Sequence, residues 1–259
     1  MSEPTNTDAM QALRESLILP DWPAPARVRA ASTTRREGVS EPPCDSLNLG
    51  HGARDDREAV TENRRRLRGV LALPAEPAWI RQVHGDTVAS AETVSDVHRP
   101  EADASVSRSP GLACVVMTAD CLPVLLCDRG GAVVAAAHAG WRGLARGILP
   151  ATVAAMDRPP GHLMAWLGPA IGSKVYEVGP EVREHFLDQD RAHGNSFRPS
   201  PAGRWLADLY AIARRQLHGH GVTAVYGGEF CTYSDPDRFY SYRRDGSSGR
   251  MASLIWLAD

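Results

Sequence analysis

The sequence is almost without lysine: among its 29 basic side chains, Lys174 is the one lysine and the rest are arginines. Chemistry that needs a lysine amine, such as a Schiff base, is therefore confined to position 174. The formal net charge of −2 gives no support to nucleic acid or another polyanion as a general partner. No apolar run reaches the roughly 18 residues of a membrane span. We therefore expect neither a nucleic acid nor a membrane as partner.

A disulfide framework is also not indicated. The five cysteines are an odd number without Cys-x-x-Cys spacing, and residues 1–8 are polar with no apolar signal-peptide core. These features predict reduced thiols and a cytoplasmic protein.

The remaining composition is that of a globular enzyme-sized chain. Its 259 residues, 43% of them hydrophobic, suffice for a sizeable core. We predict a mobile tail over residues 1–16 and a single domain over 17–259. Helical and strand patterns mix without strict alternation, which favours an α+β (mixed α/β) fold over a doubly wound sheet. The predicted strands are 27–34, 79–83, 102–107, 112–118, 163–167, 222–225 and 253–257, and the predicted helices are 56–70, 142–156, 180–188 and 206–218.

A hairpin is predicted near the middle of the chain, where apolar runs flank the polar, Gly-bearing segment 128–131. A hairpin centred on the Arg129–Gly130 bond places Cys121 opposite His138, with Cβ atoms about 5 Å apart. This separation suits two ligands of one metal, since zinc binds Cys sulfur and His nitrogen at roughly 2.0–2.3 Å. The alternative, a buried core cysteine and a strand-end histidine, stays open at this point.

The segment after His138 predicts an anion site. A strand, a Gly-bearing turn at Gly140 and a helix start leave backbone N–H groups free at the positive end of a helix dipole. Arg142 and Arg146 add guanidinium groups suited to phosphate or carboxylate. A purely structural turn is the alternative.

Several blocks of the sequence together resemble a known family, over residues 27 to 257. The strongest blocks are Arg81-Gln82-Val83-His84-Gly85-Asp86, Ala119-Asp120-Cys121-Leu122-Pro123 and His138-Ala139-Gly140-Trp141-Arg142-Gly143. Weaker blocks agree in order: Ser46-Leu47-Asn48-Leu49-Gly50, Leu167-Gly168-Pro169-Ala170-Ile171-Gly172, Cys231-Thr232, Tyr240-Ser241-Tyr242-Arg243-Arg244-Asp245-Gly246 and Gly249-Arg250-Met251-Ala252. They resemble the YfiH-like, laccase-domain family, whose members are called polyphenol oxidase, peptidoglycan editing factor or purine nucleoside phosphorylase.

The resemblance implies a monomeric, cytoplasmic zinc enzyme with a layered αββα fold. It implies phosphorolysis of adenosine, inosine and methylthioadenosine, with adenosine deamination as a further activity, so that a nucleoside and phosphate are the partners. By motif, the metal ligands are His84, Cys121 and His138. One departure is visible, because Glu37 precedes Gly38-Val39-Ser40 where the family commonly has a second glycine.

Two His and one Cys without an obvious fourth ligand fit an open, catalytic zinc. In the mechanism that follows, phosphate attacks C1′ of the ribose and a carboxylic acid protonates the departing purine. Glu177 is the preferred acid, and Asp120 beside Cys121 is the second candidate. Further predictions place Arg142 on phosphate, Asn48 on the ribose or base and Arg243 on the substrate. The alternatives are a plain turn residue at Asn48 and a salt-bridged surface arginine at Arg243.

Three alternatives belong to other functional classes. A copper-dependent polyphenol oxidase would need several His-x-His pairs, of which the chain has only His218-Gly219-His220, although thiolate does bind copper. An amide hydrolase editing peptidoglycan precursors would use Cys121 as nucleophile, His138 as base and Asp120 or Asp103 to orient the histidine. A non-catalytic binding protein would not need a complete set of metal ligands.

Overall fold

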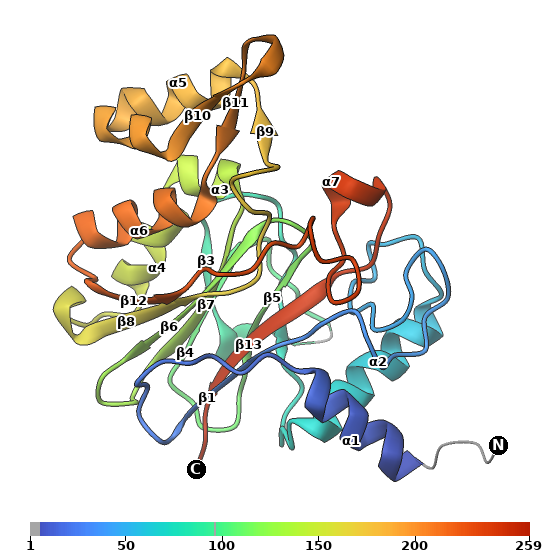
Figure 1. Cartoon of the computed structure of the whole chain (residues 1–259). Coiled ribbons are helices and arrows are strands. Elements are labelled where there is room, and N and C mark those ends of the chain that lie inside the picture. The colour runs from blue at the N-terminus through green and yellow to red at the C-terminus, as the bar shows by residue number, and fades with distance from the viewer. Residues whose placement is uncertain (1–5, 96) are drawn as a thin grey trace.

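Three sheets organise the structure, a computed structural model that describes residues 6–95 and 97–259 (Figure 1). The strand orders are β12-β8-β6-β7-β4-β3, β1-β13-β5-β2 and β10-β11-β9. The strands are β1 (Val28–Ser32), β2 (Ala78–Trp79), β3 (Val88–Ser90), β4 (Ala104–Ser107), β5 (Cys114–Thr118), β6 (Leu122–Asp128), β7 (Val134–Ala139), β8 (Leu163–Leu167), β9 (Glu177–Val178), β10 (Phe197–Ser200), β11 (Arg204–Ala207), β12 (Ala224–Gly227) and β13 (Met251–Leu257).

Most helices lie around the two larger sheets, and α5 (Pro180–Gln189) lies beside the small sheet of β9, β10 and β11 (Figure 1). The helices are α1 (Asn6–Ser16), α2 (Arg57–Val70), α3 (Trp141–Arg146), α4 (Ile148–Ala155), α5, α6 (Leu209–Gly219) and α7 (Tyr242–Asp245), with short 3₁₀ turns at Ala91–Thr93, Pro160–His162, Arg191–Ser196 and Pro201–Gly203. No helix within residues 6–95 and 97–259 is both long and apolar enough to cross a membrane.

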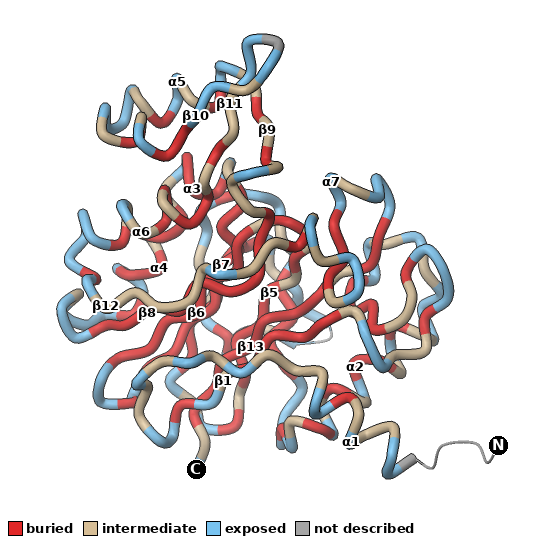
Figure 2. Tube along the Cα trace, viewed as in Figure 1, coloured by how far each residue is buried: buried red, intermediate tan, exposed pale blue. Residues whose placement is uncertain are grey.

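The two larger sheets share one core, seen as the buried centre of Figure 2. Strands β6 and β7 are buried at every position, because both faces of their sheet are covered. On one face, Leu125 and Ala136 cluster with Val116 and Ile255 of the four-stranded sheet. On the other face, the even-numbered β6 leucines and valine cluster with apolar residues of α3, α4 and α6.

The mixed α/β class predicted from the sequence is confirmed. A separate cluster joins Leu67 of α2 to Val115 and Leu254 on the outer face of the four-stranded sheet. This packing of helices outside two facing sheets supports the αββα layering, which stays a prediction.

The predicted hairpin exists, but its centre lies one residue later than expected. Strands β6 and β7 pair antiparallel with Pro123 opposite His138 and Leu122 opposite Ala139. The expected pairing of Cys121 with His138 is therefore wrong by two residues. A shift of two keeps every side chain on its predicted face, whereas a shift of one would have reversed it. Cys121 lies just before β6, in the turn that leaves β5.

One further expectation needs revision, and the predicted tail can be described in part. The predicted helix 142–156 is two helices, α3 and α4, because Gly147 adopts a left-handed conformation with φ 94°. The predicted mobile tail over 1–16 contains α1, whose Leu13 is fully buried beside Leu47 and Val70; residues 1–5 lie outside the described residues.

The one departure from the family pattern coincides with an unusual backbone conformation. Glu37 has φ 68°, in the left-handed region where glycine carries no steric penalty. The glycine common in the family at this position is thus explained by backbone geometry.

Candidate metal centre

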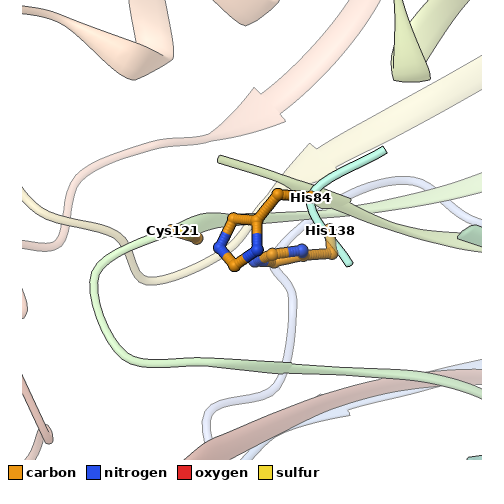
Figure 3. A group of neighbouring side chains, drawn as sticks. All are labelled: His84, Cys121 and His138. Carbon is orange, nitrogen blue, oxygen red and sulfur yellow. The ribbon is translucent and has the colours of Figure 1, made fainter. Parts of the chain in front are cut away.

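His84, Cys121 and His138 converge from three separate segments of the chain (Figure 3). One ligand atom from each lies within 4.8 Å of the others. The two imidazole rings meet edge to face, with centroids 4.8 Å apart. His138 comes from β7, Cys121 from the turn before β6, and His84 from the loop that follows β2. Among the residues that the structure describes, this is the one group of three or more such side chains placed to hold a metal ion.

Asp103, just before β4, positions both histidines. Its carboxylate accepts hydrogen bonds from the backbone N–H groups of Val83, His84 and Gly85, at 3.1, 2.9 and 2.6 Å. It also accepts one from Nδ1 of His138 at 2.8 Å. Because a carboxylate only accepts, Nδ1 of His138 carries the hydrogen and Nε2 is left to bind a metal.

The Cys121 turn is fixed by the residue before it. Asp120 has φ 91°, and its carboxylate accepts hydrogen bonds from the Thr232 hydroxyl and the Arg243 backbone N–H, both at 2.6 Å. Its own carbonyl accepts from the backbone N–H of Ile171 at 2.9 Å. The turn that presents the thiol is thereby tied to three later segments of the chain.

The electrostatics favour a thiolate at position 121. Burial by itself raises the pKa of the Cys121 thiol, but the charge on His138 and hydrogen bonds with both histidines lower it to about 6. Burial by itself lowers the pKa of His138, whereas the Cys121 thiolate and the Asp103 carboxylate raise it to about 9. The thiolate is the form that ligates metals.

These residues fit a metal ion by the chemistry of their donors. Two imidazoles and a thiolate are donors that zinc prefers, and three protein ligands leave one position open for a water or substrate. The carboxylate behind His138 is the outer support that metal-binding histidines usually have. Thiolate and imidazole also bind copper.

Gly140 makes room for the thiolate, and this gives a prediction. A Cβ at this position would lie 2.7 Å from Cys121 Sγ, although the Gly140 backbone, with φ −65° and ψ 165°, accommodates any residue. Gly140→Ala should therefore fold but displace the sulfur and weaken metal binding by roughly ten- to hundredfold, measured by competition with a chromophoric chelator. Gly161→Ala, at an open position, is the matched control; equal affinity in both variants would contradict the prediction.

The metal-binding group lines a cavity of about 640 Å³, within the range of small-molecule sites. The cavity continues between the loop at His51, the stacked pair Arg64 and Trp79, and Arg250 near the start of β13. None of its lining residues, within the part of the chain that the structure describes, is an aspartate or glutamate.

Comparison with known proteins identifies the family. A family model described as multi-copper polyphenol oxidoreductase laccase matches residues 29–258. The chain belongs to this family, the YfiH-like laccase-domain proteins. It is 58% identical to a purine nucleoside phosphorylase of Pseudomonas aeruginosa, over 93% of this chain and 98% of that one. It is 51% identical to the purine nucleoside phosphorylase YfiH of Escherichia coli K12, with the same coverage.

Solved structures of the family have the same fold. A Neisseria meningitidis protein of family DUF152 superposes with a TM-score of 0.91 at 50% identity, covering 94% of this chain and all of that one. YlmD of Geobacillus stearothermophilus has a TM-score of 0.82 at 31% identity, covering 90% and 93% of the two chains.

Within this laccase-domain fold, the predicted substrate residues Asn48, Arg142 and Arg243 are not among the residues that line the cavity. Asn48 is fully buried, with Oδ1 accepting from the backbone N–H groups of Gly50 and Arg250, and Nδ2 donating to the Asp55 carboxylate at 2.7 Å. Arg142 is exposed over the Trp141 ring, 4.6 Å from its centroid. Neither residue lines the cavity.

Glu177 and Arg243 are in contact, but through the backbone carbonyl of Glu177 and not through its carboxylate. Arg243 Nη1 donates to the Glu177 carbonyl at 2.7 Å. The Glu177 carboxylate accepts from the Ser200 hydroxyl at 2.5 Å and pairs with Arg204 at 3.3 Å. Arg146, the second predicted anion contact, donates to the His84 carbonyl at 3.1 Å. This contact holds the loop that carries a predicted metal ligand.

Sequence reasoning overlooked two groups of site residues. Asp103 was weighed only as an orienter in a hydrolase, although it contacts both histidine segments. Arg64, Trp79 and Arg250 were not singled out at all. Arg250 belongs to the closing Gly249-Arg250-Met251-Ala252 block, which was the available signal.

Proposed function

We propose that the protein is a purine nucleoside phosphorylase that depends on a zinc ion held by His84, Cys121 and His138. The observation that carries the proposal is the placement of this complete donor set in a cavity of nucleoside size. Relatives 58% and 51% identical over nearly the whole chain are named purine nucleoside phosphorylases, which supports the same activity here. Adenosine, inosine and methylthioadenosine are the proposed substrates, and adenosine deamination is a proposed second activity.

The reaction breaks the bond between C1′ of the ribose and the purine nitrogen and forms a bond between C1′ and a phosphate oxygen. The electron pair of the broken bond leaves with the purine, which takes up one proton, so the products are the free base and ribose 1-phosphate. His84, Cys121 and His138 would hold the zinc ion, which would supply a Lewis acid for this step. Asp103 holds His138 in the tautomer that ligates, and Asp120 holds the turn that presents Cys121.

Zinc is proposed over copper because of the number of sites. A multicopper oxidase needs several copper centres, while a single group of three donors is present among residues 6–95 and 97–259. His218 and His220 lie at the end of α6, where His220 Nδ1 contacts the Gln216 carbonyl at 2.9 Å. Metal analysis of protein produced without added copper should give about one zinc per chain.

The proposed function is tested with metal-loaded and chelated protein, each incubated with inosine, adenosine or methylthioadenosine, with and without phosphate. Free base should form only where both metal and phosphate are present, and chromatography measures it. Base formed without phosphate would point to hydrolysis instead. The amide-hydrolase alternative would be established by two results together. No sample would turn over a nucleoside, and the protein would cleave a peptidoglycan precursor in a reaction that a thiol reagent abolishes.

The acid that protonates the purine is proposed to be Glu177, whose side chain is 35% exposed. Asp120, the second candidate, is buried, and its two oxygens accept the hydrogen bonds from Thr232 and Arg243 that hold the Cys121 turn. Glu177→Gln should then lower kcat by about a hundredfold or more and leave metal content unchanged. Glu184→Gln, an exposed glutamate of α5, is the control. A normal kcat in Glu177→Gln together with a lost kcat in Asp120→Asn, at full metal content, would transfer the role to Asp120.

A further inference from the structure

The cavity beside the metal centre has a strongly basic lining. Besides the candidate metal ligands, its charged or titratable side chains are Arg64, Arg81, Arg99, Arg250, His51 and Tyr242. Arg81 forms an ion pair with Glu101, which is not among the lining residues. With no acidic residue among the described lining residues, the interior presents positive charge to whatever enters.

Arg64 is held rigidly in the cavity wall. It is 8% exposed, and its Nε and Nη2 donate to the Leu49 carbonyl at 2.9 and 2.7 Å. Its guanidinium carbon lies 3.8 Å from the centroid of the Trp79 ring. A guanidinium stays charged at every physiological pH. The contacts therefore fix a permanent cation at the cavity surface, with little conformational freedom left to lose on binding.

Arg250 is anchored to the same segment of chain. Its backbone N–H donates to Asn48 Oδ1 at 2.8 Å, and its carbonyl accepts from the Leu49 N–H at 3.1 Å. Its Nη1 donates to the carbonyls of Ser248 and Gly249 at 2.6 and 2.9 Å. No hydrogen bond to a described residue uses Nε or Nη2 of Arg250. This pair of donors is the edge of the guanidinium that binds two oxygens of one phosphate or carboxylate.

His51 lies in the electric field of these arginines. Burial lowers its pKa first, and the charges of Arg64, Arg99 and Arg57 lower it further. The imidazole is therefore neutral near pH 7 and can donate one hydrogen bond to an anion.

Arg64 is connected to the candidate metal centre through Met117 of β5 and Gln82. Nη2 of Arg64 contacts Met117 Sδ at 3.7 Å, and Met117 is pinned by hydrogen bonds in both directions with Gln82, each at 2.8 Å. Gln82 lies two residues before His84, and Met117 lies four before Cys121. Two of the three segments that carry the candidate metal ligands, those of His84 and Cys121, thus also contribute to the wall that holds Arg64.

We propose that Arg64 and Arg250, assisted by His51, form the subsite that binds inorganic phosphate as the attacking co-substrate. This inference rests on the proposed phosphorylase activity and deepens it. It moves the phosphate from Arg142, which is exposed and stacked on Trp141, to a pair of arginines fixed in the cavity wall. Asn48, fully buried and bonded to the Arg250 backbone, acts here as a positioning residue.

The test measures phosphate binding directly, by calorimetric titration of inorganic phosphate into the metal-loaded full-length protein without nucleoside. Arg250→Gln should weaken phosphate binding by roughly tenfold or more, as expected when hydrogen bonds to a charged group are lost. Arg250→Lys keeps the charge but not the two-donor edge and should recover part of the affinity. In turnover, Arg250→Gln should raise KM for phosphate and leave KM for inosine within about twofold.

Arg183→Gln is the matched control for Arg64→Gln. Arg183 also stacks on a tryptophan, with its guanidinium carbon 4.0 Å from the Trp205 ring centroid, but it lies on α5 and does not line the cavity. Thermal unfolding of both variants separates loss of packing from loss of phosphate affinity. Arg64→Gln should lose affinity and Arg183→Gln should not; equal affinity in the two variants, both folded, would overturn the role of Arg64.

Three outcomes separate the inference from its rivals. Weakened phosphate binding in Arg142→Gln, with wild-type binding in Arg250→Gln, would overturn it and return the phosphate to the start of α3. Inosine 5′-monophosphate binding that depends on Arg250, while inorganic phosphate binding does not, would overturn it in favour of a phosphate carried by the substrate. Arg250-dependent phosphate binding in a protein that cleaves no nucleoside would uphold the anion subsite and reject the phosphorylase proposal.

Discussion

Replacing Cys121 by serine should remove the metal and the activity together. The hydroxyl of serine stays protonated near pH 7, whereas the pKa of the Cys121 thiol, about 6, makes it a thiolate at that pH. Two histidines alone leave an incomplete donor set, since catalytic zinc sites have three protein ligands. Metal content measured by mass spectrometry should fall from about one ion per chain to a trace, and base release should fall to the uncatalysed level.

Cys231→Ser provides the matched control. Cys231 is also half-buried, its Sγ accepts from the Gly172 N–H at 3.2 Å and lies 3.2 Å from the Ser234 hydroxyl, and it is not part of the metal-binding group. This variant should keep its metal and its turnover. If Cys121→Ser kept a full complement of metal but lost all turnover, the thiol would act as a nucleophile, as in the amide-hydrolase alternative, and its assignment as a ligand would fail.

The local parts of the fold could be predicted from the sequence because their signals are local. Helix α2 begins after Asp56, whose side chain accepts from the Glu58 N–H, as its sequence pattern indicates. Strand β8 agrees with its predicted range at both ends. The three metal-binding candidates were found through their sequence blocks, and the structure brings them together. The hairpin was also predicted, but its register depends on the turn, where the Asp128 carboxylate accepts from the Ala132 and Val133 N–H groups.

What the sequence did not reveal depends on contacts between distant segments. Strands β9, β10 and β11 are two to four residues long and pair only with one another, so no extended pattern marks them. Asn48 was predicted to contact substrate, yet it bonds Arg250, 202 residues away. Such a partner becomes visible only once the chain ends meet, here where β1 pairs with β13. Arg64 and Arg250, which we propose as the phosphate subsite, likewise line one cavity only in the folded chain, whereas the predicted contact Arg142 is suggested by its local sequence.

Asp103→Asn should weaken metal binding by about ten- to hundredfold, as is typical when the carboxylate behind a metal-binding histidine is lost. Both Asp103 oxygens accept hydrogen bonds, from His84 N–H and His138 Nδ1 on one side and from Val83 and Gly85 N–H on the other. Asparagine replaces one of these oxygens by an NH₂ group, which cannot accept a hydrogen bond, so one of the two pairs of donors loses its acceptor. The His84 loop would then lose a hydrogen bond, or His138 would lose the contact that selects its tautomer.

Asp128→Asn separates this positioning role from loss of stability. Asp128 is buried at the turn of the β6–β7 hairpin, the hairpin that carries His138. Its carboxylate also accepts hydrogen bonds from three backbone N–H groups, those of Gly130, Ala132 and Val133, but it is not part of the metal-binding group. Both substitutions should lower the free energy of unfolding by about 1–3 kcal/mol, measured by urea denaturation of the metal-free proteins. Competition with a chromophoric chelator should then show weakened metal binding in Asp103→Asn alone. Equal metal affinity in the two variants would mean that Asp103 supports the loop without positioning the ligands.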